Sequence, residues 1–509
     1  MWIALDLIRR KRITKLYLLF INIIQFFIHN LSINKREILM SKAPLLEELL
    51  KYHKEENLIL SMPGNKSGKA FLRDSLGKKF KETLGNLDIT EVDPLDNLHC
   101  PEGVIKEAEE LLAKTYNVKK AYFLVNGSSS GNLASIFAAF KEGDEVLVER
   151  NCHKSIYNGL ILRKLKVIYI DAVIDENIGI FLPPREKEIN EALSKAFNPK
   201  GIIITSPNYF GISYDIENKI KELKEKGLKV IIDSAHGAHF VVNKHLPKSL
   251  ANLGDYVVLS AHKTLPSLTQ GAYLLVNNNE ENIDFYVKTF MTTSPSYLIM
   301  ASLDYARYYL DNYGKDDYGN LKERAEKWKE KINLLGKVSV ISDENLFNKY
   351  TIDKSRYLIT LNKGYSGHKL LDYLRVNKIQ AEMSFSRGIV LIFSPSNTEE
   401  DFEKIYLAIK NLNINVLKTN EKNAVFSKIS PVKVLEPYEV FNLNSTSLDI
   451  NDALGKIAKE AIIPYPPGIP LVCAGEKITK EAIDIIKEYI ENRLKVIGVQ
   501  DNIIKVIEE

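Results

Sequence analysis

The chain has 509 residues, of which 45% are hydrophobic and 26% are charged, with 26 glycines and 18 prolines. This composition excludes a disordered, collagen-like or disulfide-stapled small protein and is typical of a globular chain with two or three domains. The three cysteines, Cys100, Cys152 and Cys473, are odd in number and lack CxxC spacing. Such usage favours a reducing compartment, and we expect the cytoplasm.

The net charge of +4 comes from the N-terminal leader, residues 1–39, in which seven basic and two acidic residues contribute +5. The rest of the chain therefore carries −1, and we expect neither nucleic acid nor anionic membrane as a partner. An apolar run at 16–28 is shorter than the roughly 20 residues a membrane span needs. Amphipathic helical spacing begins after Met40, so we expect Met40 to be the working start, with a membrane anchor as the alternative.

Between about residues 100 and 280, short apolar β-rich runs alternate with helical stretches. The runs are 121–125, 145–149, 166–170, 201–205, 229–233 and 256–260. This alternation predicts an α/β fold with a parallel sheet covered on both faces, which binds ligands beyond the carboxyl ends of its strands.

The remaining chain predicts smaller segments. A helical stretch runs to about 335, and weaker strands at 355–361 and 388–394 flank a helix at 368–376, which indicates a smaller α/β domain. A polar stretch near 412–428 precedes a third segment, whose consecutive prolines at 464–470 predict a rigid loop. We expect five parts: a leader (1–39), an N-terminal arm (40–100), a major domain (101–310), a small α/β domain (311–415) and a C-terminal domain (416–509).

The residues that follow three of these strands are chemically distinctive. The turn Asn126–Asn132, with three serines and two glycines, opens a helix and offers donors to a phosphate, although a serine-capped tight turn fits the same residues. Asp233 ends a buried strand, where a carboxylate needs a cationic partner. Lys263 also follows a buried strand, where burial lowers the pKa of an amine and makes it nucleophilic, although a lysine that reaches the surface is the favoured interpretation of this residue taken alone.

Histidines near these positions are candidate metal ligands. His236 and His239 are three residues apart, and His–Cys pairs occur at 99–100 and 152–153. None of these spacings matches a zinc pattern, so we expect no metal.

The combination of an anion-binding turn, an acid and a lysine 30 residues later provides what is needed to hold pyridoxal phosphate. Lys263 would bind the cofactor covalently, Asp233 would pair with the ring nitrogen, and the serines would bind the phosphate. His153, at the start of the helix after 145–149, is a candidate flat partner for the ring.

The segment SAHKTLPSLTQGAYL (260–274) resembles the pyridoxal-phosphate lysine signature of the ornithine/lysine/arginine decarboxylase family, which has fold type I. Six further blocks are similar to family blocks in the same order, so a chance match is negligible. They are MPGNKSG (62–68), DPLDNLHCPEG (93–103), NGSSSGN (126–132), RNCHKS (150–155), DSAHGAH (233–239) and PYPPGIP with GE (464–470, 475–476).

The resemblance implies a role for each site residue. Lys263 forms the Schiff base with His262 beside it, His153 stacks on the ring, and Asp233 pairs with the ring nitrogen. The phosphate is bound by Ser128, Ser129 and Ser260, and Ala235 and His236 contact the cofactor. The chain departs from the usual family pattern at Asn65, Ser234 and Ala474. Because the first block lies shortly after Met40, we expect the short form of the family, without the N-terminal wing domain of long members. The resemblance of the short form then implies a homodimer or dimer-based oligomer.

The resemblance implies α-decarboxylation of a basic amino acid, with arginine favoured over lysine or ornithine. An aminotransferase or aldolase on the same fold, or a non-catalytic pyridoxal-phosphate binder, is the alternative. A basic side chain needs acids at the far end of its pocket, for which Glu91, Asp93 and Asp96 are candidates; solvated loop acids are the simpler interpretation of these three.

Overall fold

The computed structural model describes residues 43–508, except 243, 280, 281, 348, 420–430, 466–469 and 492–494. The chain divides into two compact units, with the boundary between Asn57 and Leu58. In the first unit, helix α2 (Pro44–Lys54) confirms the helix expected after Met40. The leader 1–39 and most of the proline-rich loop lie outside the described residues. None of the described helices has the length and apolar character needed to cross a bilayer.

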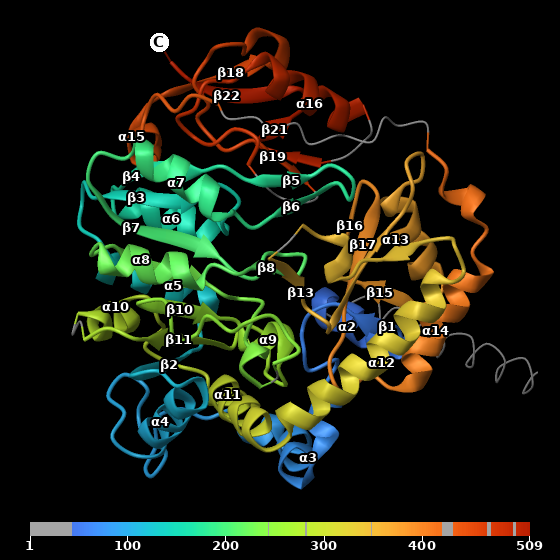
Figure 1. Cartoon of the computed structure of the whole chain (residues 1–509). Coiled ribbons are helices and arrows are strands. Elements are labelled where there is room, and N and C mark those ends of the chain that lie inside the picture. Colours follow the sequence, from blue (N-terminus) through green and yellow to red (C-terminus); the bar gives the residue numbers. More distant parts are fainter. Residues whose placement is uncertain are drawn as a thin grey trace, which may run out of the picture. The chain divides into compact units, whose positions relative to one another are not determined.

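The second unit is built around one sheet of seven described strands, in the order β2-β11-β10-β9-β7-β3-β4 (Figure 1). Six strands run parallel and β11 runs antiparallel to both its neighbours. The six parallel strands confirm the six predicted runs, whereas β11 was not predicted. The strands are β2 (Lys120–Leu124), β3 (Glu145–Glu149), β4 (Lys166–Ile170), β7 (Pro199–Thr205), β9 (Lys229–Asp233), β10 (Tyr256–Leu259) and β11 (Ala272–Val276).

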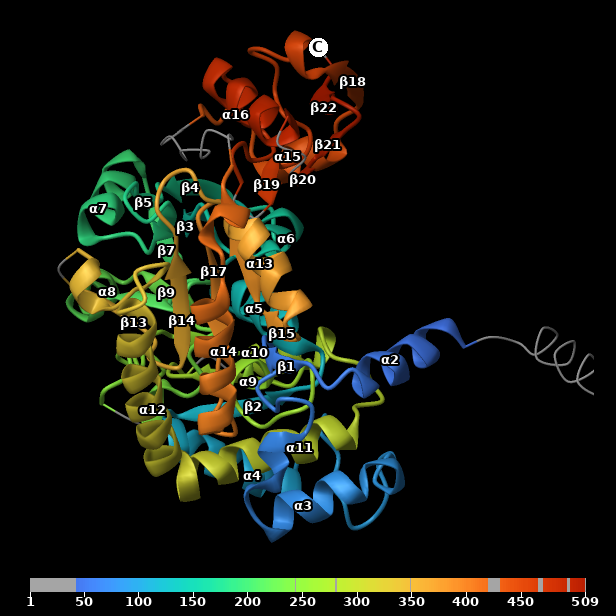
Figure 2. The ribbon, with the colours of Figure 1, turned by 90° about the vertical axis from the view of Figure 1, so that its right-hand side faces the viewer.

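Helices lie on both sides of this sheet, with α7 and α8 on one side and α5 and α6 on the other (Figure 2). The central strands are buried along almost their whole length, as a doubly covered parallel sheet requires. The helices around the sheet are α4 (Val104–Tyr116), α5 (Gly127–Ala139), α6 (Lys154–Leu162), α7 (Glu186–Lys195), α8 (Glu217–Glu225), α10 (Ile283–Thr289) and α11 (Tyr297–Tyr309).

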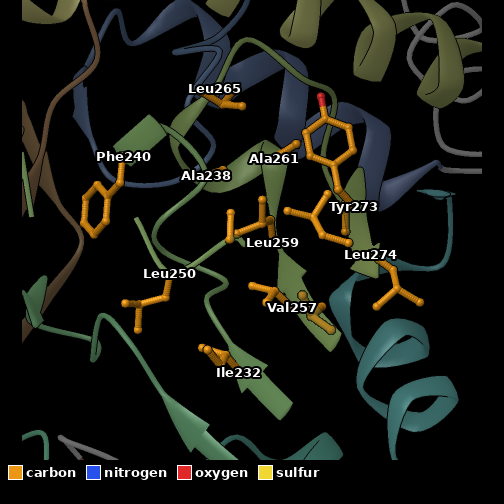
Figure 3. Packing of buried hydrophobic residues seen from close by; sticks show 14 of the residues in the cluster. Ile232, Ala238, Phe240, Leu250, Val257, Leu259, Ala261, Leu265, Tyr273 and Leu274 are labelled. Atoms are coloured by element: carbon orange, nitrogen blue, oxygen red, sulfur yellow. The ribbon is translucent and has the colours of Figure 1, made fainter. Parts of the chain in front are cut away.

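The core under the end of β10 supports the short helix α9 (Ala261–Thr264). Ile232, Val257 and Leu259 come from neighbouring strands, and Ala261 and Leu265 lie at either end of α9 in the same cluster (Figure 3). All five side chains are buried. The residues between Ala261 and Leu265 are therefore anchored on a rigid apolar base.

A second sheet has four described antiparallel strands in the order β12-β14-β17-β16. This sheet confirms the two weaker strands and the helix predicted between them. A separate two-stranded sheet, which was not predicted, pairs β1 with β15 in parallel. The long helical stretch that precedes the second sheet is also confirmed. The elements are β1 (Leu58–Leu60), α12 (Lys315–Asn333), β12 (Ser339–Val340), β14 (Arg356–Thr360), α13 (Gly367–Val376), β15 (Ile379–Ala381), β16 (Met383–Phe385), β17 (Gly388–Ile392) and α14 (Glu399–Asn411).

The C-terminal residues form their own apolar cluster, to which Phe181 of the β5–β6 hairpin also belongs. The C-terminal elements are α15 (Pro437–Asn442), β18 (Ser445–Asp449), β19 (Ile463–Tyr465), α16 (Lys480–Glu491), β20 (Lys495–Ile497), β21 (Val499–Gln500) and β22 (Ile503–Ile507). Elsewhere in the chain, β5 (Val173–Asp175) and β6 (Ile180–Leu182) form the hairpin, and β8 (Ile212–Tyr214) pairs with β13 (Tyr350–Ile352). The domain limits at residues 100, 310 and 415 stay predictions.

Candidate active site

Lys263 lies in α9, directly beyond the carboxyl end of β10. Three hydrogen bonds hold this helix: Gly64 N–H donates to the carbonyl of His262 (2.7 Å), His262 N–H donates to the carbonyl of Gly271 (3.1 Å), and the Tyr318 hydroxyl donates to the carbonyl of Thr264 (2.7 Å). Gly64 approaches so closely that a Cβ would lie 2.6 Å from the backbone carbon of Thr264. The MPGNKSG block therefore fixes the backbone that carries the lysine.

The amine of Lys263 lies among charged and ring groups. Its Nζ is 3.0 Å from Nε2 of His236. Burial lowers the pKa of Lys263, Arg356 lowers it further, and Asp233 and Glu382 oppose this shift. A lysine whose pKa is lowered by burial is a suitable nucleophile for a carbonyl.

Asp233 ends β9 with its side chain buried. Its Oδ1 accepts the N–H of Ala235 (3.1 Å), and its Oδ2 accepts Nδ2–H of Asn132 (3.0 Å). Each carboxylate oxygen has a second lone pair, so the group can still accept an N–H from a ligand ring. The residue is thus both fixed and able to act as an acceptor.

His153 caps the start of α6, where its Nδ1 accepts the N–H of Ser155 (3.2 Å) and lies 2.8 Å from the Ser155 hydroxyl. The same hydroxyl accepts Nδ2–H of Asn132 (2.9 Å). Asn132 therefore connects the strand end that carries Asp233 to the turn that carries His153. The imidazole is exposed and its orientation is fixed by these bonds.

The predicted phosphate-binding residues also lie at this edge of the sheet. Ser128 and Ser129 are in the first turn of α5, whose first backbone N–H groups have no partner within the helix. The hydroxyl of Ser260 is wholly buried and has no hydrogen-bond partner within the part of the chain that the structure describes. A buried unpaired donor and a helix N-terminus, both at the carboxyl ends of parallel strands, fit the phosphate of pyridoxal phosphate.

The three acids proposed for the substrate side chain lie in the loop before α4. The carboxylate of Asp96 accepts the backbone N–H groups of Glu102 (3.0 Å), Gly103 (2.8 Å) and Ile105 (3.0 Å). Asp96 therefore caps the chain entering α4, a role that neither of the two interpretations of this acid included. Substrate roles for Glu91 and Asp93 stay predictions.

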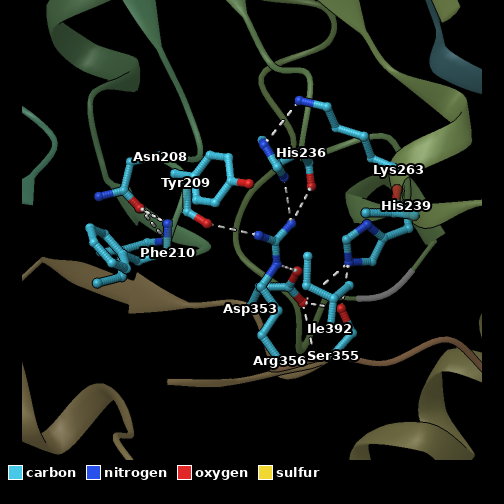
Figure 4. A network of polar contacts seen from close by, with 12 residues as sticks. Asn208, Tyr209, Phe210, His236, His239, Lys263, Asp353, Ser355, Arg356 and Ile392 are labelled. Carbon is cyan, nitrogen blue, oxygen red and sulfur yellow. Dashed lines mark hydrogen bonds and ion pairs between the residues drawn. The ribbon is translucent and has the colours of Figure 1, made fainter. Parts of the chain in front are cut away.

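Sequence reasoning missed two residues that the fold brings to the site. Asn132 belongs to the NGSSSGN block, and its position one turn into a helix that begins at Gly127 could have indicated an inward-facing amide. Arg356 begins β14 in the second sheet, and its NH2 lies 3.1 Å from Nδ1 of His236, 120 residues away (Figure 4). No local signal marks such a contact.

The sheet is mostly parallel and carries three groups at one edge: a lysine beyond one strand, an acid at the end of the neighbouring strand, and a helix N-terminus. Together they define a pyridoxal-phosphate enzyme of fold type I.

Comparisons with known proteins identify the family. The family model described as Orn/Lys/Arg decarboxylase, major domain, matches residues 43–362, and the model of the C-terminal domain of the same family matches residues 419–498. The chain is 33% identical over 468 residues to the uncharacterised protein YaaO of Bacillus subtilis, and this alignment covers 90% of this chain and 96% of YaaO. The chain is 28% identical to the arginine decarboxylase of the same organism, in an alignment that covers 92% of this chain and 98% of that enzyme.

Among solved structures, the lysine decarboxylase of Francisella novicida superposes with a TM-score of 0.72 at 20% identity, covering 95% of this chain and 83% of that one. The chain belongs to the Orn/Lys/Arg decarboxylase family. The predicted fold type I architecture, amino acid decarboxylase activity and dependence on pyridoxal phosphate are thereby confirmed.

Proposed function

We propose that this decarboxylase acts on arginine to give agmatine and CO2, with lysine as the second candidate. The arginine decarboxylase of Bacillus subtilis matches over 98% of its own length, whereas the lysine decarboxylase structure has a further sixth that this chain does not cover. The choice of arginine rests on this match of lengths, whereas the observation that carries the chemistry is the position of Lys263, Asp233 and the N-terminal turn of α5 at one edge of the sheet.

Pyridoxal phosphate supplies an electron-deficient ring that accepts the electron pair left when CO2 departs. Lys263 would bind it covalently, and Asp233 would hold the proton on the ring nitrogen. Hydrogen bonds from Ala235 and Asn132 keep the Asp233 carboxylate aimed at one position. Such fixed orientation is what makes an electrostatic contribution to the rate large.

Other residues would orient the cofactor. The ring of His153 would stack on it, and the hydroxyls of Ser128, Ser129 and Ser260 would donate to the phosphate. His236 would contact the cofactor next to Asp233. The unpaired hydroxyl of Ser260 supports this set, because a buried donor costs free energy until it finds an acceptor.

We propose that Lys263 or His262 returns the proton to Cα of the product. Nδ1 of His262 lies 2.9 Å from the carbonyl oxygen of Gly271, which can only accept, so Nδ1 carries the proton and Nε2 is the basic nitrogen. Glu91 and Asp93 are proposed to bind the basic end of the substrate. Asp96 is the weakest of the three candidates, because backbone N–H groups already occupy its carboxylate.

Incubation of the purified enzyme and cofactor with arginine, lysine or ornithine, followed by mass spectrometry of the amines, tests the proposal. We expect agmatine as the main product and none from Lys263→Ala. Cadaverine as the main product would show that the substrate is lysine and not arginine. Release of a keto acid without CO2 would contradict decarboxylation and favour an aminotransferase.

We further propose a homodimer in the cytoplasm as the working unit. The family resemblance supports the dimer, and the three cysteines, which are all free, support a reducing compartment. Analytical ultracentrifugation of the purified enzyme checks the first point, because a monomer at micromolar concentration would contradict it. Fractionation of cells that express the chain checks the second.

A further inference from the structure

A continuous chain of polar contacts joins Lys263 to the second sheet (Figure 4). Nζ of Lys263 lies 3.0 Å from Nε2 of His236, and Nδ1 of His236 lies 3.1 Å from NH2 of Arg356. The same guanidinium donates through Nε to Asp353 (3.0 Å) and through NH1 to the carbonyl of Tyr209 (3.1 Å). Both nitrogens of the His236 ring are therefore engaged.

The hydrogens in this chain can be assigned from chemistry alone. A guanidinium only donates, so Arg356 must donate to Nδ1 of His236, and that nitrogen carries no proton. A neutral imidazole then carries its proton on Nε2, which faces Lys263. An ammonium has no lone pair to accept this proton, whereas a neutral amine does.

We propose that Arg356 fixes the tautomer of His236 so that its Nε2–H donates to Lys263, and that this bond holds the lysine as a neutral amine whenever the cofactor does not occupy it. This proposal rests on the proposed role of Lys263 as the residue that binds the cofactor. It makes His236 and Arg356 positioning residues that act through the lysine.

Arg356 can impose the tautomer because burial and hydrogen bonds fix the position of its guanidinium. Its side chain and that of Asp353 are fully buried. The Asp353 carboxylate also accepts the N–H and the hydroxyl of Ser355 (2.9 and 2.7 Å) and lies 3.2 Å from Nε2 of His239. Although burial opposes ionisation, His239 and Arg356 hold the pKa of Asp353 below its usual range. A permanent carboxylate thus anchors the guanidinium.

The other charged groups around the pair act in both directions. Burial and the charge of Arg356 disfavour the ammonium form of Lys263, whereas Asp233 of β9 and Glu382, which lies between β15 and β16, favour it. Burial lowers the pKa of His236 well below its usual value, and Lys263, Arg356, His262 and His153 add to this. His236 is therefore neutral at physiological pH, as the proton assignment requires.

The neutral amine matters because only its lone pair can attack the aldehyde carbon of pyridoxal phosphate, with formation of the carbon–nitrogen bond and release of one water. An ammonium would first have to lose its proton inside a buried site. The contact thus prepares Lys263 to take up the cofactor, and to take it back after each turnover.

The test measures the titration of Lys263 in cofactor-free protein, so it does not depend on decarboxylation. Acetic anhydride acetylates only neutral amines, and mass spectrometry of the peptide with Lys263 over pH 6 to 10 gives the titration midpoint. We expect His236→Leu to move the midpoint to higher pH and to reduce labelling at pH 7 roughly tenfold. His236→Gln keeps an acceptor for Arg356 and a donor for Lys263, so we expect it to restore the wild-type midpoint.

Arg356→Lys separates the tautomer effect from simple charge repulsion, because it keeps the positive charge and loses the planar fork. We expect a shift in the same direction as for His236→Leu. Arg375→Met, at an exposed arginine of α13, is the matched control and should leave the midpoint unchanged. An unchanged midpoint in His236→Leu, or failure of His236→Gln to restore it, would overturn the proposal. Should Arg356→Lys not fold, the two His236 variants decide alone. A wild-type Lys263 that is neutral at pH 7 in a protein with no decarboxylase activity would leave this inference standing and refute the proposed function.

Discussion

The side chains of Arg150 and Glu476, 326 residues apart, meet in a two-point ion pair with distances of 2.9 and 2.5 Å. Both groups are almost completely buried. Glu476 also accepts the N–H of Cys473 (2.8 Å), and the carbonyl of Arg150 accepts the hydroxyl of Tyr157. Because Arg150 precedes His153 by three residues, the C-terminal segment braces the turn that carries this histidine.

Glu476→Gln should destabilise the protein by about 3–5 kcal/mol, because it leaves the buried guanidinium of Arg150 without a counter-charge. Denaturation in urea followed by circular dichroism measures this free energy of unfolding. Asp484→Asn, which breaks the exposed pair with Lys480, is the control and should change it by less than about 1 kcal/mol. If both variants changed the free energy of unfolding equally, the buried pair would contribute no more to stability than the exposed one.

Lys263→Ala should abolish covalent cofactor binding while the protein stays folded, because the removed side chain lies in a short helix held by backbone hydrogen bonds. Reduction with borohydride traps the cofactor on its lysine, and peptide mass spectrometry then locates it. Cofactor mass on a different peptide, such as the one with the buried Lys66, would refute the assignment.

Asp233→Asn should retain the cofactor but lose turnover by roughly 10²–10³, since a neutral amide cannot stabilise a proton on the ring nitrogen during decarboxylation. Steady-state kinetics with arginine, together with cofactor content from absorbance, separates the two effects. Ser234→Ala, at the neighbouring buried residue, is the matched control. A rate near that of the wild type would make Asp233 a structural acid.

Glu149, at the end of β3, should make stability depend on pH. Its Oε2 accepts the N–H of Thr205 (2.8 Å), and burial raises its pKa from 4.5 to about 7. Because the folded-state pKa is the higher one, the stabilisation from the bound proton is complete below pH 4.5 and is lost as the pH rises through 7. The loss corresponds to about 3 kcal/mol.

Glu149→Gln should remove this dependence, because an amide does not titrate. Free energies of unfolding at pH 5 and pH 8 measure it, and Glu176→Gln, at an exposed acid, should behave like the wild type. The same fall in stability between the two pH values in Glu149→Gln would assign it to another group.

The sequence by itself determined the elements and the chemistry at their ends. Six apolar runs became six parallel strands because strands buried on both faces need continuous apolar residues. Since the carboxyl ends of parallel strands meet at one edge, residues as far apart as Asn126, Asp233 and Lys263 could be assigned to a single site. The antiparallel β11 was missed because its apolar run follows Lys263 closely and was assigned to the lysine signature segment rather than to a strand.

Only the tertiary structure decided which groups support that site from a distance. Asn132 connects Asp233 to the turn of His153, Arg356 reaches His236 from a second sheet, and Glu476 reaches Arg150 from the C-terminal segment. Such partners are charged or polar side chains that look like surface residues in a sequence. Their burial depends on how sheets more than 100 residues apart pack against each other, and local patterns carry no record of that packing.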